Sequence, residues 1–278
     1  MVRHAVSLPA WMGVLCLLAA CGDEGSFPGG APPTPPETEA DAAVPWPDVE
    51  PIAAPTPYEP KQTMFSHSGD TLYRIDPKLL KVEEVGQFWP NAPHMTDLAV
   101  TPDGKLYAIS NNNLYEVNGL TAEVRWIVKV PGLTNVALTF DKDGSLLAAD
   151  KSGGFRRVDP HTGQVTEIGT YGAGLGSSGD LVALADGRLY DMNDVDAAKS
   201  NNELISIDPQ TGVATTVGGT GFRMVWGLSF WGGTLYGFTR AGEFLAIDPQ
   251  TGQGTLIQAT GHEFWGAAVT PEAPLYLE

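Results

Sequence analysis

The sequence predicts an all-β fold, a β-propeller of five blades, and three observations support this prediction. A unit of two hairpins recurs five times along the 278-residue chain. Successive units lie about 40 to 50 residues apart, which is the length of a four-stranded propeller blade. After the first 20 residues, no stretch of convincing length has the spacing of apolar residues that an amphipathic helix requires.

One hairpin of each unit is centred on an Asp-Pro type of turn. The segments "SIDPQTGVATTV" from Ser206 and "AIDPQTGQGTLI" from Ala246 share the core "IDPQTG". Asp opens such a turn, Pro presets φ at the next position, and Gly supplies a left-handed residue. Backbone geometry therefore explains the repetition, and we expect no catalytic role for the Asp or Asn that opens each turn, at positions 76, 118, 159, 208 and 248.

The other hairpin of each unit begins with a run of small apolar residues that does not alternate with polar ones. This pattern is typical of a strand buried on both faces, as expected where blades crowd toward a central axis. Two hairpins give the four strands of a blade. The innermost strands are therefore expected to begin at Asp97, Asn135, Asp180, Gly227 and Gly266.

Ring closure has two solutions in the sequence. The run from Met64 aligns as a second strand, and "GAAVT" from Gly266 would supply the missing first strand of its blade. The two chain ends would then share one blade, which avoids an exposed sheet edge. The segment "PLYLE" from Pro274 also aligns as a second strand, so six blades with a partial one is the alternative.

The first 20 residues have the features of a secretion signal. Arg3 and His4 precede an apolar run that ends in "LAAC" at Cys21. "LAAC" resembles the bacterial lipobox, which implies a lipoprotein signal peptide over 1–20 and a diacylglyceryl group on the Cys21 thiol. The alternative is ordinary cleavage near Ala20 with an unmodified cysteine. The other cysteine, Cys16, lies inside the signal, so the folded part has no disulfide.

Residues 21–62 are dominated by Pro, Gly, Ala and acidic residues. Such a segment buries too little apolar surface to fold, and its prolines favour extended conformers. We interpret it as a disordered tether that precedes a propeller domain over 63–278. The net charge of −17 argues against nucleic acid as a partner.

The repeats also resemble those of a known class of protein. The lines "LYRIDP", "TGQVTEIG" and "TPDGKLYAI" are similar to repeats of bacterial exported propellers, many of them lipoproteins of unknown function, and more distantly to NHL-type and quinoprotein-type propellers. The resemblance covers Met64 to Glu278 and implies blades rather than an activity. Quinoprotein repeats usually have Trp where this chain has Gly169, Gly218 or Gln258, so a quinone cofactor is not implied.

The residues that begin the innermost strands form the sharpest candidate site. In a propeller they lie at one mouth of the central channel, where two carboxylates and an amide would converge on a cation such as calcium or on sugar hydroxyls. Two tryptophans precede two of these strands and would stack on a ligand. The alternative is that the polar side chains hydrogen-bond to neighbouring strand ends. The predicted ligand-binding residues are Asp97, Asn135, Asp180, Trp226 and Trp265.

Histidines in the same loops suggest a second kind of chemistry. After His4 and the turn residue His161 are set aside, His67, His94 and His262 remain. His94 and His262 precede innermost strands and would act with Glu263, Asp97 and Asp180 as a general-base or metal site. Their spacing matches no zinc motif.

The fourth unit carries an insertion, "DMNDVDAAKSNNE", over 191–203. We expect it to project from the same face. Its acidic residues would hold calcium, although the EF-hand pattern is absent; the alternative is a solvated polar loop. The predicted metal ligands here are Asp191, Asn193, Asp194 and Asp196, in addition to Asp97 and Asp180.

These observations favour an exported propeller, anchored to a membrane of the bacterial cell envelope, that binds a saccharide, a peptide or a partner protein. A metal-assisted hydrolase or lyase at the channel mouth is the alternative, and a scaffold without a small ligand is the third hypothesis.

Overall fold

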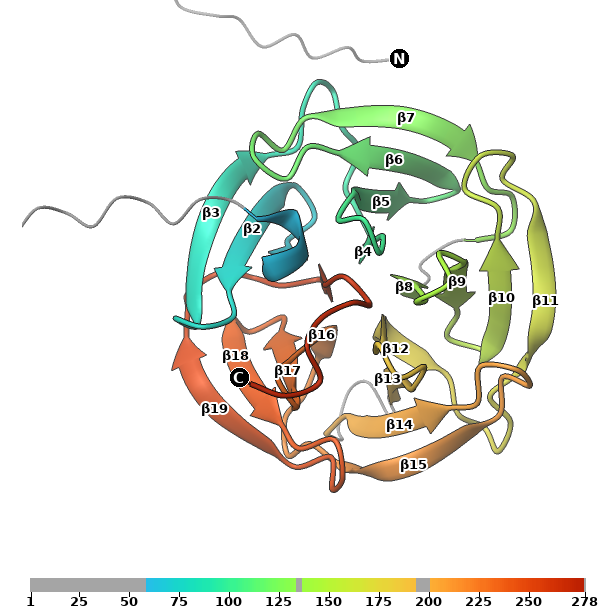
Figure 1. Cartoon of the computed structure of the whole chain (residues 1–278), viewed down its shortest axis with the longest axis vertical. Coiled ribbons are helices and arrows are strands. Elements are labelled where there is room, and N and C mark those ends of the chain that lie inside the picture. Colours follow the sequence, from blue (N-terminus) through green and yellow to red (C-terminus); the bar gives the residue numbers. More distant parts are fainter. Residues whose placement is uncertain (1–58, 134–136, 194–200, 278) are drawn as a thin grey trace, which may run out of the picture. The chain divides into compact units, whose positions relative to one another are not determined.

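The computed structural model describes residues 59–133, 137–193 and 201–277, and it confirms the five-bladed propeller. Five sheets of four antiparallel strands are arranged in a ring around a central axis (Figure 1). No helix among the described residues is long and apolar enough to cross a lipid bilayer. The alternative of six blades is wrong, because the described strands form five complete sheets.

Four blades are built from consecutive strands that follow one another from the axis outward. The second blade consists of β4 (Asp97–Val100), β5 (Leu106–Ser110), β6 (Asn113–Val117) and β7 (Val124–Lys129). The third consists of β8 (Ala137–Phe140), β9 (Leu146–Ala149), β10 (Gly154–Val158) and β11 (Val165–Thr170). The fourth consists of β12 (Ser177–Ala183), β13 (Leu189–Asn193), β14 (Glu203–Ile207) and β15 (Ala214–Gly219). The fifth consists of β16 (Val225–Trp231), β17 (Thr234–Thr239), β18 (Glu243–Ile247) and β19 (Gly254–Ala259).

The first blade joins the two ends of the folded domain. Its strands are β20 (Gly266–Ala268), β1 (Met64–His67), β2 (Thr71–Asp76) and β3 (Lys81–Gln87). In β1, Ser66 pairs with Ala267 and His67 with Gly266, as the prediction for "GAAVT" required. The competing segment Pro274–Leu277 forms no strand. Instead, the carbonyl of Pro274 accepts a 2.8 Å hydrogen bond from the Gly232 N–H.

The domain also includes four residues that we expected to end the tether. Pro60–Gln62 form a 3₁₀ turn, η1, before Thr63 leads into β1. Lys61 Nζ lies 2.8 Å from Glu272 Oε2, so this segment is paired with the turn that follows β20. Glu59–Gln62 are therefore described together with the propeller, while the boundary of the tether stays a prediction. The predicted signal peptide, the lipidated Cys21 and the tether up to residue 58 lie outside the described residues.

Burial follows position in the blade. The innermost strands β4 and β8 are buried at every residue, as their unbroken apolar runs predicted. The outermost strands β11 and β19 alternate between partly buried and exposed residues. Four apolar clusters pack the faces of adjacent blades against one another, so the core lies between blades rather than on one side of a sheet.

The Asp-Pro turns have the predicted chemistry. Asp208 Oδ1 accepts hydrogen bonds from the backbone N–H groups of Gln210 at 2.8 Å and Thr211 at 3.1 Å. Gly212 then takes a left-handed φ of 75°. These bonds lower the pKa of the Asp208 carboxyl below its usual value, because they favour the charged form. Equivalent side-chain bonds are made by Asp76, Asn118, Asp159 and Asp248.

Candidate functional site

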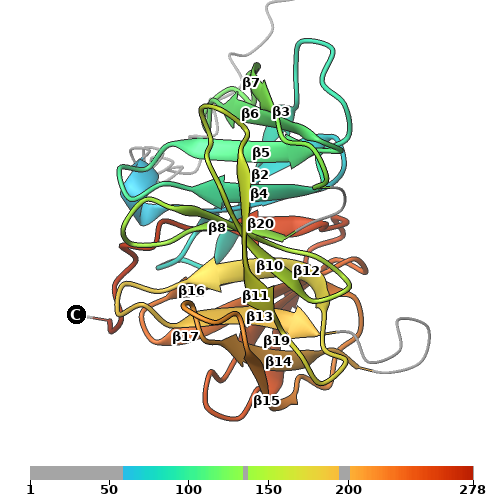
Figure 2. The ribbon, with the colours of Figure 1, turned by 90° about the vertical axis from the view of Figure 1, so that its right-hand side faces the viewer.

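The propeller has two faces that differ in the loops they carry. We call the loop face the one formed by the loops that enter the innermost strands and those between second and third strands, including residues 68–70, 88–96, 240–242 and 260–265. The turn face carries the remaining turns and η1. Figure 2 shows η1 and the segment after β20 on the same side of the ring.

A strip of aromatic and charged side chains crosses the loop face. The Arg240 guanidinium lies 5.2 Å from the centre of the Trp226 ring, and Arg240 Nε donates a 2.6 Å hydrogen bond to Glu263 Oε1. Trp265 follows Glu263 by two positions in the sequence, and its ring lies 6.1 Å from the ring of His94. Trp226 and Trp265 are both partly exposed. We call these five residues the aromatic strip.

The aromatic strip contains two of the three predicted catalytic residues, His94 and Glu263. The third, His262, lies outside it. His94 is exposed, and its ring neighbour is Trp265. The His262 ring instead lies 4.7 Å from the Tyr73 ring and is partly buried. Glu263 is paired with Arg240, which lowers the pKa of its carboxyl below the usual value. A carboxylate held in its ionised form by an arginine is a poor general base at neutral pH.

The predicted ligands Asp97 and Asp180 lie inside the molecule, at the inner ends of the loops. Both side chains are fully buried. Asp97 Oδ2 accepts a 2.6 Å hydrogen bond from the Leu138 N–H of β8. Asp180 Oδ2 accepts bonds from the Leu228 N–H of β16 at 2.8 Å and the Ala267 N–H of β20 at 2.7 Å. The two carboxylates therefore connect innermost strands of different blades, as the hydrogen-bonding alternative required.

Close packing on the axis explains why glycines, Gly227 and Gly266, begin two of the five innermost strands. A Cβ on Gly227 would lie 3.0 Å from the carbonyl carbon of Gly266 and 3.2 Å from Cβ of Ala267. On Gly266 it would meet Asp97 Oδ1 and would lie 2.6 Å from His67 Nε2. Side chains are excluded at these positions because neighbouring blades occupy the space.

His67 is a site residue that no sequence motif identified. It ends β1, is fully buried, and its Nε2 has no hydrogen-bond partner among the described residues. Burial lowers the pKa of His67 to about 4, although the bond to the Ser68 carbonyl acts in the opposite direction. The sequence paired "GAAVT" with the run from Met64, but only the strand register of the structure places His67 beside Gly266.

Burial also governs the charge state of the axial carboxyls. It raises the pKa of both Asp97 and Asp180 well above the usual range. The charge of Asp180 raises the pKa of Asp97 further, whereas backbone N–H bonds oppose the shift at both residues. Each carboxyl is therefore favoured in its neutral form over a wider pH range than an exposed aspartate.

The insertion does not begin where the sequence suggested. Asp191 and Asn193 belong to β13 and are buried. Asp191 accepts hydrogen bonds from the Tyr171 hydroxyl at 2.6 Å and the Ser177 hydroxyl at 3.0 Å. Burial raises the pKa of Asp191 to about 7, against the effect of those two bonds. Asn193 Oδ1 accepts a 3.1 Å bond from the Gly176 N–H, so both residues serve as internal acceptors rather than on a projecting loop.

Three predicted residues have no structural account, since Asn135, Asp194 and Asp196 lie outside the described residues. Within the described part of the chain, no three His, Cys, Asp or Glu side chains are grouped as a metal ion would require. The calcium site proposed for the aspartates stays a prediction.

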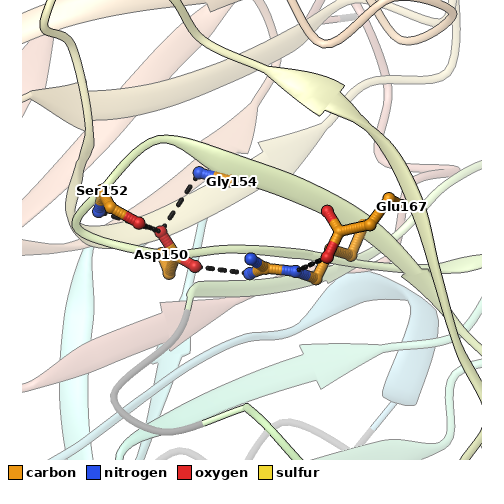
Figure 3. A network of polar contacts seen from close by, with 5 residues as sticks. Asp150, Ser152, Gly154 and Glu167 are labelled. Atoms are coloured by element: carbon orange, nitrogen blue, oxygen red, sulfur yellow. Dashed lines mark hydrogen bonds and ion pairs between the residues drawn. The ribbon is translucent and has the colours of Figure 1, made fainter.

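The third blade carries a polar network that no sequence motif indicated. Asp150, in the loop between β9 and β10, accepts hydrogen bonds from the Ser152 hydroxyl at 2.6 Å and the Gly154 N–H at 3.1 Å (Figure 3). It also pairs with Arg156, which binds Glu167. Burial acts to raise the pKa of Asp150, but the hydrogen bonds and Arg156 outweigh it and lower the pKa to about 2. Every charge in this network has a partner, so the network stabilises the loop.

Comparisons with known proteins bear on the fold alone. No protein-family model and no curated protein matches the chain. A solved structure described as the de novo evolutionary emergence of a symmetrical protein is similar over 76% of this chain and 99% of that one, with a TM-score of 0.53 and 19% identity. The crystal structure of TolB from Acinetobacter baumannii has a TM-score of 0.46 and 18% identity over 72% of this chain, which spans only 53% of that one. The lipid anchor and the kinship with NHL-type repeats remain predictions, and the chain is similar to these structures as a β-propeller.

Proposed function

We propose that this chain is an exported β-propeller, anchored to a cell-envelope membrane through lipid on Cys21, that binds a saccharide on its loop face. The observation that carries the proposal is the aromatic strip. It combines two partly exposed indole rings with a guanidinium, a carboxylate and an exposed imidazole on one face.

The chemistry of the strip fits a sugar ring better than the other ligands considered. Indole faces stack on the apolar C–H face of a pyranose, while charged side chains exchange hydrogen bonds with its hydroxyls. Arg240 bridges Trp226 and Glu263, which restrains all three side chains before a ligand arrives. Such preorganisation reduces the entropy cost of binding.

The first described residues of the chain do not cover the loop face. η1 lies on the turn face, where Pro60 packs beside Gly104 and Lys61 pairs with Glu272. The chain therefore enters the propeller on the face opposite the aromatic strip.

Titration of the purified full chain with a panel of soluble oligosaccharides, followed by tryptophan fluorescence and calorimetry, tests the proposal. Trp226→Ala and Trp265→Ala are each expected to weaken binding by about tenfold or more, since stacked aromatics commonly anchor a ligand. Trp126→Ala is the matched control, because Trp126 is 55% exposed on the outermost strand β7.

A saccharide that binds equally well to both loop-face variants would contradict the assignment of the site. If no saccharide binds, and a peptide or protein is captured only when both tryptophans are present, the ligand is a peptide or protein rather than a saccharide.

The anchor is tested separately by detergent phase partitioning. The wild-type chain is expected in the detergent phase and Cys21→Ser in the aqueous phase, whereas wild type in the aqueous phase would indicate ordinary cleavage near Ala20.

A further inference from the structure

The turn between β6 and β7 differs in its first two residues from the corresponding turns of the other four blades. Where those turns read Asp-Pro, this one reads Asn118-Gly119, which is the only Asn-Gly pair in the sequence. Proline has no backbone N–H, whereas Gly119 has one, and no described residue accepts a hydrogen bond from it. A backbone nitrogen without a partner therefore follows the amide side chain of Asn118 directly.

The turn holds the Asn118 side chain in a defined orientation. Its Oδ1 accepts a 2.9 Å hydrogen bond from the Leu120 N–H, as Asp159 Oδ1 accepts one from the His161 N–H at 2.8 Å. Asn118 is exposed, so water reaches its amide. Gly119 has no Cβ to shield its nitrogen. The Leu120 N–H would also bind an anionic oxygen at Oδ1, and a donor placed where negative charge develops lowers the barrier of a reaction.

We propose that Asn118 is a site of spontaneous deamidation. The Gly119 nitrogen attacks Cγ of Asn118, the bond between Cγ and Nδ2 breaks, and the proton of the attacking nitrogen passes through water to the amide nitrogen, which leaves as ammonia. The product is a five-membered succinimide. One water molecule then adds to either carbonyl of this ring and opens it, which gives aspartate or isoaspartate. Overall, one water is consumed and one ammonia is released, and nothing is oxidised or reduced.

The two products differ in their effect on the turn. Aspartate leaves the backbone unchanged and is the residue that opens the other four turns. Isoaspartate routes the main chain through the former side chain, which lengthens the backbone by one carbon. The Asn118 carbonyl, which accepts the N–H groups of Thr121 at 3.2 Å and Ala122 at 2.8 Å, then no longer belongs to the main chain. The turn therefore accommodates aspartate and is disrupted by isoaspartate.

The same turn is bonded to the first blade. Trp89, which follows β3, donates hydrogen bonds from its backbone N–H to the Ala122 carbonyl at 3.3 Å and from Nε1 to the Thr121 carbonyl at 2.9 Å. Trp89 belongs to the loop-face segment 88–96, which carries His94 of the aromatic strip. Isoaspartate in the turn is therefore expected to loosen the contact between the first and second blades and the start of this segment.

Storage of the purified full chain in mildly alkaline buffer, followed by trypsin digestion and fragmentation of the peptides in a mass spectrometer, tests the proposal. The tryptic peptide over 106–125 contains Asn118 and three internal controls, Asn111, Asn112 and Asn113. Conversion at Asn118 is expected to exceed conversion at each control by at least about tenfold, because none of the controls is followed by Gly. An isoaspartyl methylation assay measures the share of isoaspartate. A synthetic peptide over 106–125, stored alongside, gives the rate without the fold.

Two variants separate the chemistry from its effect on stability. Gly119→Pro supplies the residue of the other four turns and removes the attacking N–H, so conversion is expected to stop. Asn118→Asp is expected to keep the Tm of the fresh wild-type chain within about 2 °C, whereas the isoaspartate fraction of the stored chain is expected to lose at least about 3 °C.

The proposal is overturned if Asn118 stays intact in the folded chain for as long as the peptide needs to convert. Equal conversion at Asn113, or conversion that persists in Gly119→Pro, would overturn it as well. Isoaspartate that forms without a fall in Tm would overturn the proposed effect on the contact between the blades.

Discussion

Asp180 illustrates how single residues connect this ring. Its Oδ2 receives the N–H groups of Leu228 and Ala267, which belong to the innermost strands of the fifth and first blades. The residue itself lies at a break in the register of β12 with β13, between Ser177 and Leu181. One side chain thus joins three blades, including the one that closes the ring.

Replacing Asp180 by Ala is expected to destabilise the domain by about 3 kcal/mol or more. The reason is that each buried N–H left without an acceptor costs roughly 1–3 kcal/mol. Asp180→Asn keeps one carbonyl oxygen for both donors, so at most about half that loss is expected. Urea denaturation followed by tryptophan fluorescence measures both values.

The control for this series is Asp186→Ala, in the exposed turn of the same hairpin, where the side chain pairs with Arg188. It is expected to change the stability by less than about 1 kcal/mol. Equal losses for Asp180→Ala and Asp186→Ala would show that the axial carboxyl does not connect the blades energetically.

At the scale of elements, the Asp-Pro turns hold neighbouring blades together. Gly252 of the turn between β18 and β19 is buried, and a Cβ there would lie 2.8 Å from the carbonyl carbon of Gly218 in β15. Gly212 of the preceding turn approaches Gly169 of β11 in the same way. The glycine that ends each "DPQTG" motif therefore has two functions, a left-handed backbone and a close contact with the blade before it.

Gly252→Ala separates these two functions when it is compared with Gly221→Ala. The φ values of the two glycines are similar, 75° and 81°, but only Gly252 is packed against backbone. Gly221→Ala is expected to cost about 1–2 kcal/mol for the left-handed conformation alone. Gly252→Ala is expected to cost at least about 2 kcal/mol more, as measured by urea denaturation. A difference near zero would mean that the turn does not pack on the neighbouring blade.

At the scale of the whole molecule, buried carboxyls oppose the usual effect of pH on stability. Asp191, Asp97 and Asp180 all have raised pKa values, so the folded state keeps protons that the unfolded chain releases above about pH 4. His67, with its pKa lowered to about 4, acts in the opposite direction between about pH 4 and pH 6.5. Of these four groups, the three carboxyls are the ones that still act above pH 6.5, and the stability they contribute is lost as the pH rises.

The free energy of unfolding is therefore expected to be lower at pH 8 than at pH 6 by at least about 1 kcal/mol. Each proton released contributes roughly 1.4 kcal/mol per pH unit. Asp191→Asn retains an acceptor for Tyr171 and Ser177 but cannot ionise, so its stability is expected to fall less between pH 5 and pH 7. Asp208→Asn, in an exposed turn, is the control. Stability that rises steadily from pH 5 to pH 8 in the wild type would contradict the raised pKa values.

The sequence by itself determined the architecture, because blades are specified locally. Each hairpin carries its own turn residues and each innermost strand its own apolar run, so a repeat near 40 residues favoured five blades and offered the closing strand. The structure then excluded the alternative of six blades. The same reasoning predicted that Asp97 and Asp180 lie where innermost strands begin. It also located the loop face on which the tryptophans gather.

Only the tertiary structure decided what those side chains do. Burial of Asp97 and Asp180, their bonds to other blades, and the meeting of His67 with Gly266 depend on contacts between residues far apart in the chain. The same holds for Asp191, which the sequence placed in a projecting loop and the structure places in β13. Repeat patterns describe one blade at a time, whereas hydrogen bonds across the axis arise only when all five blades close around it.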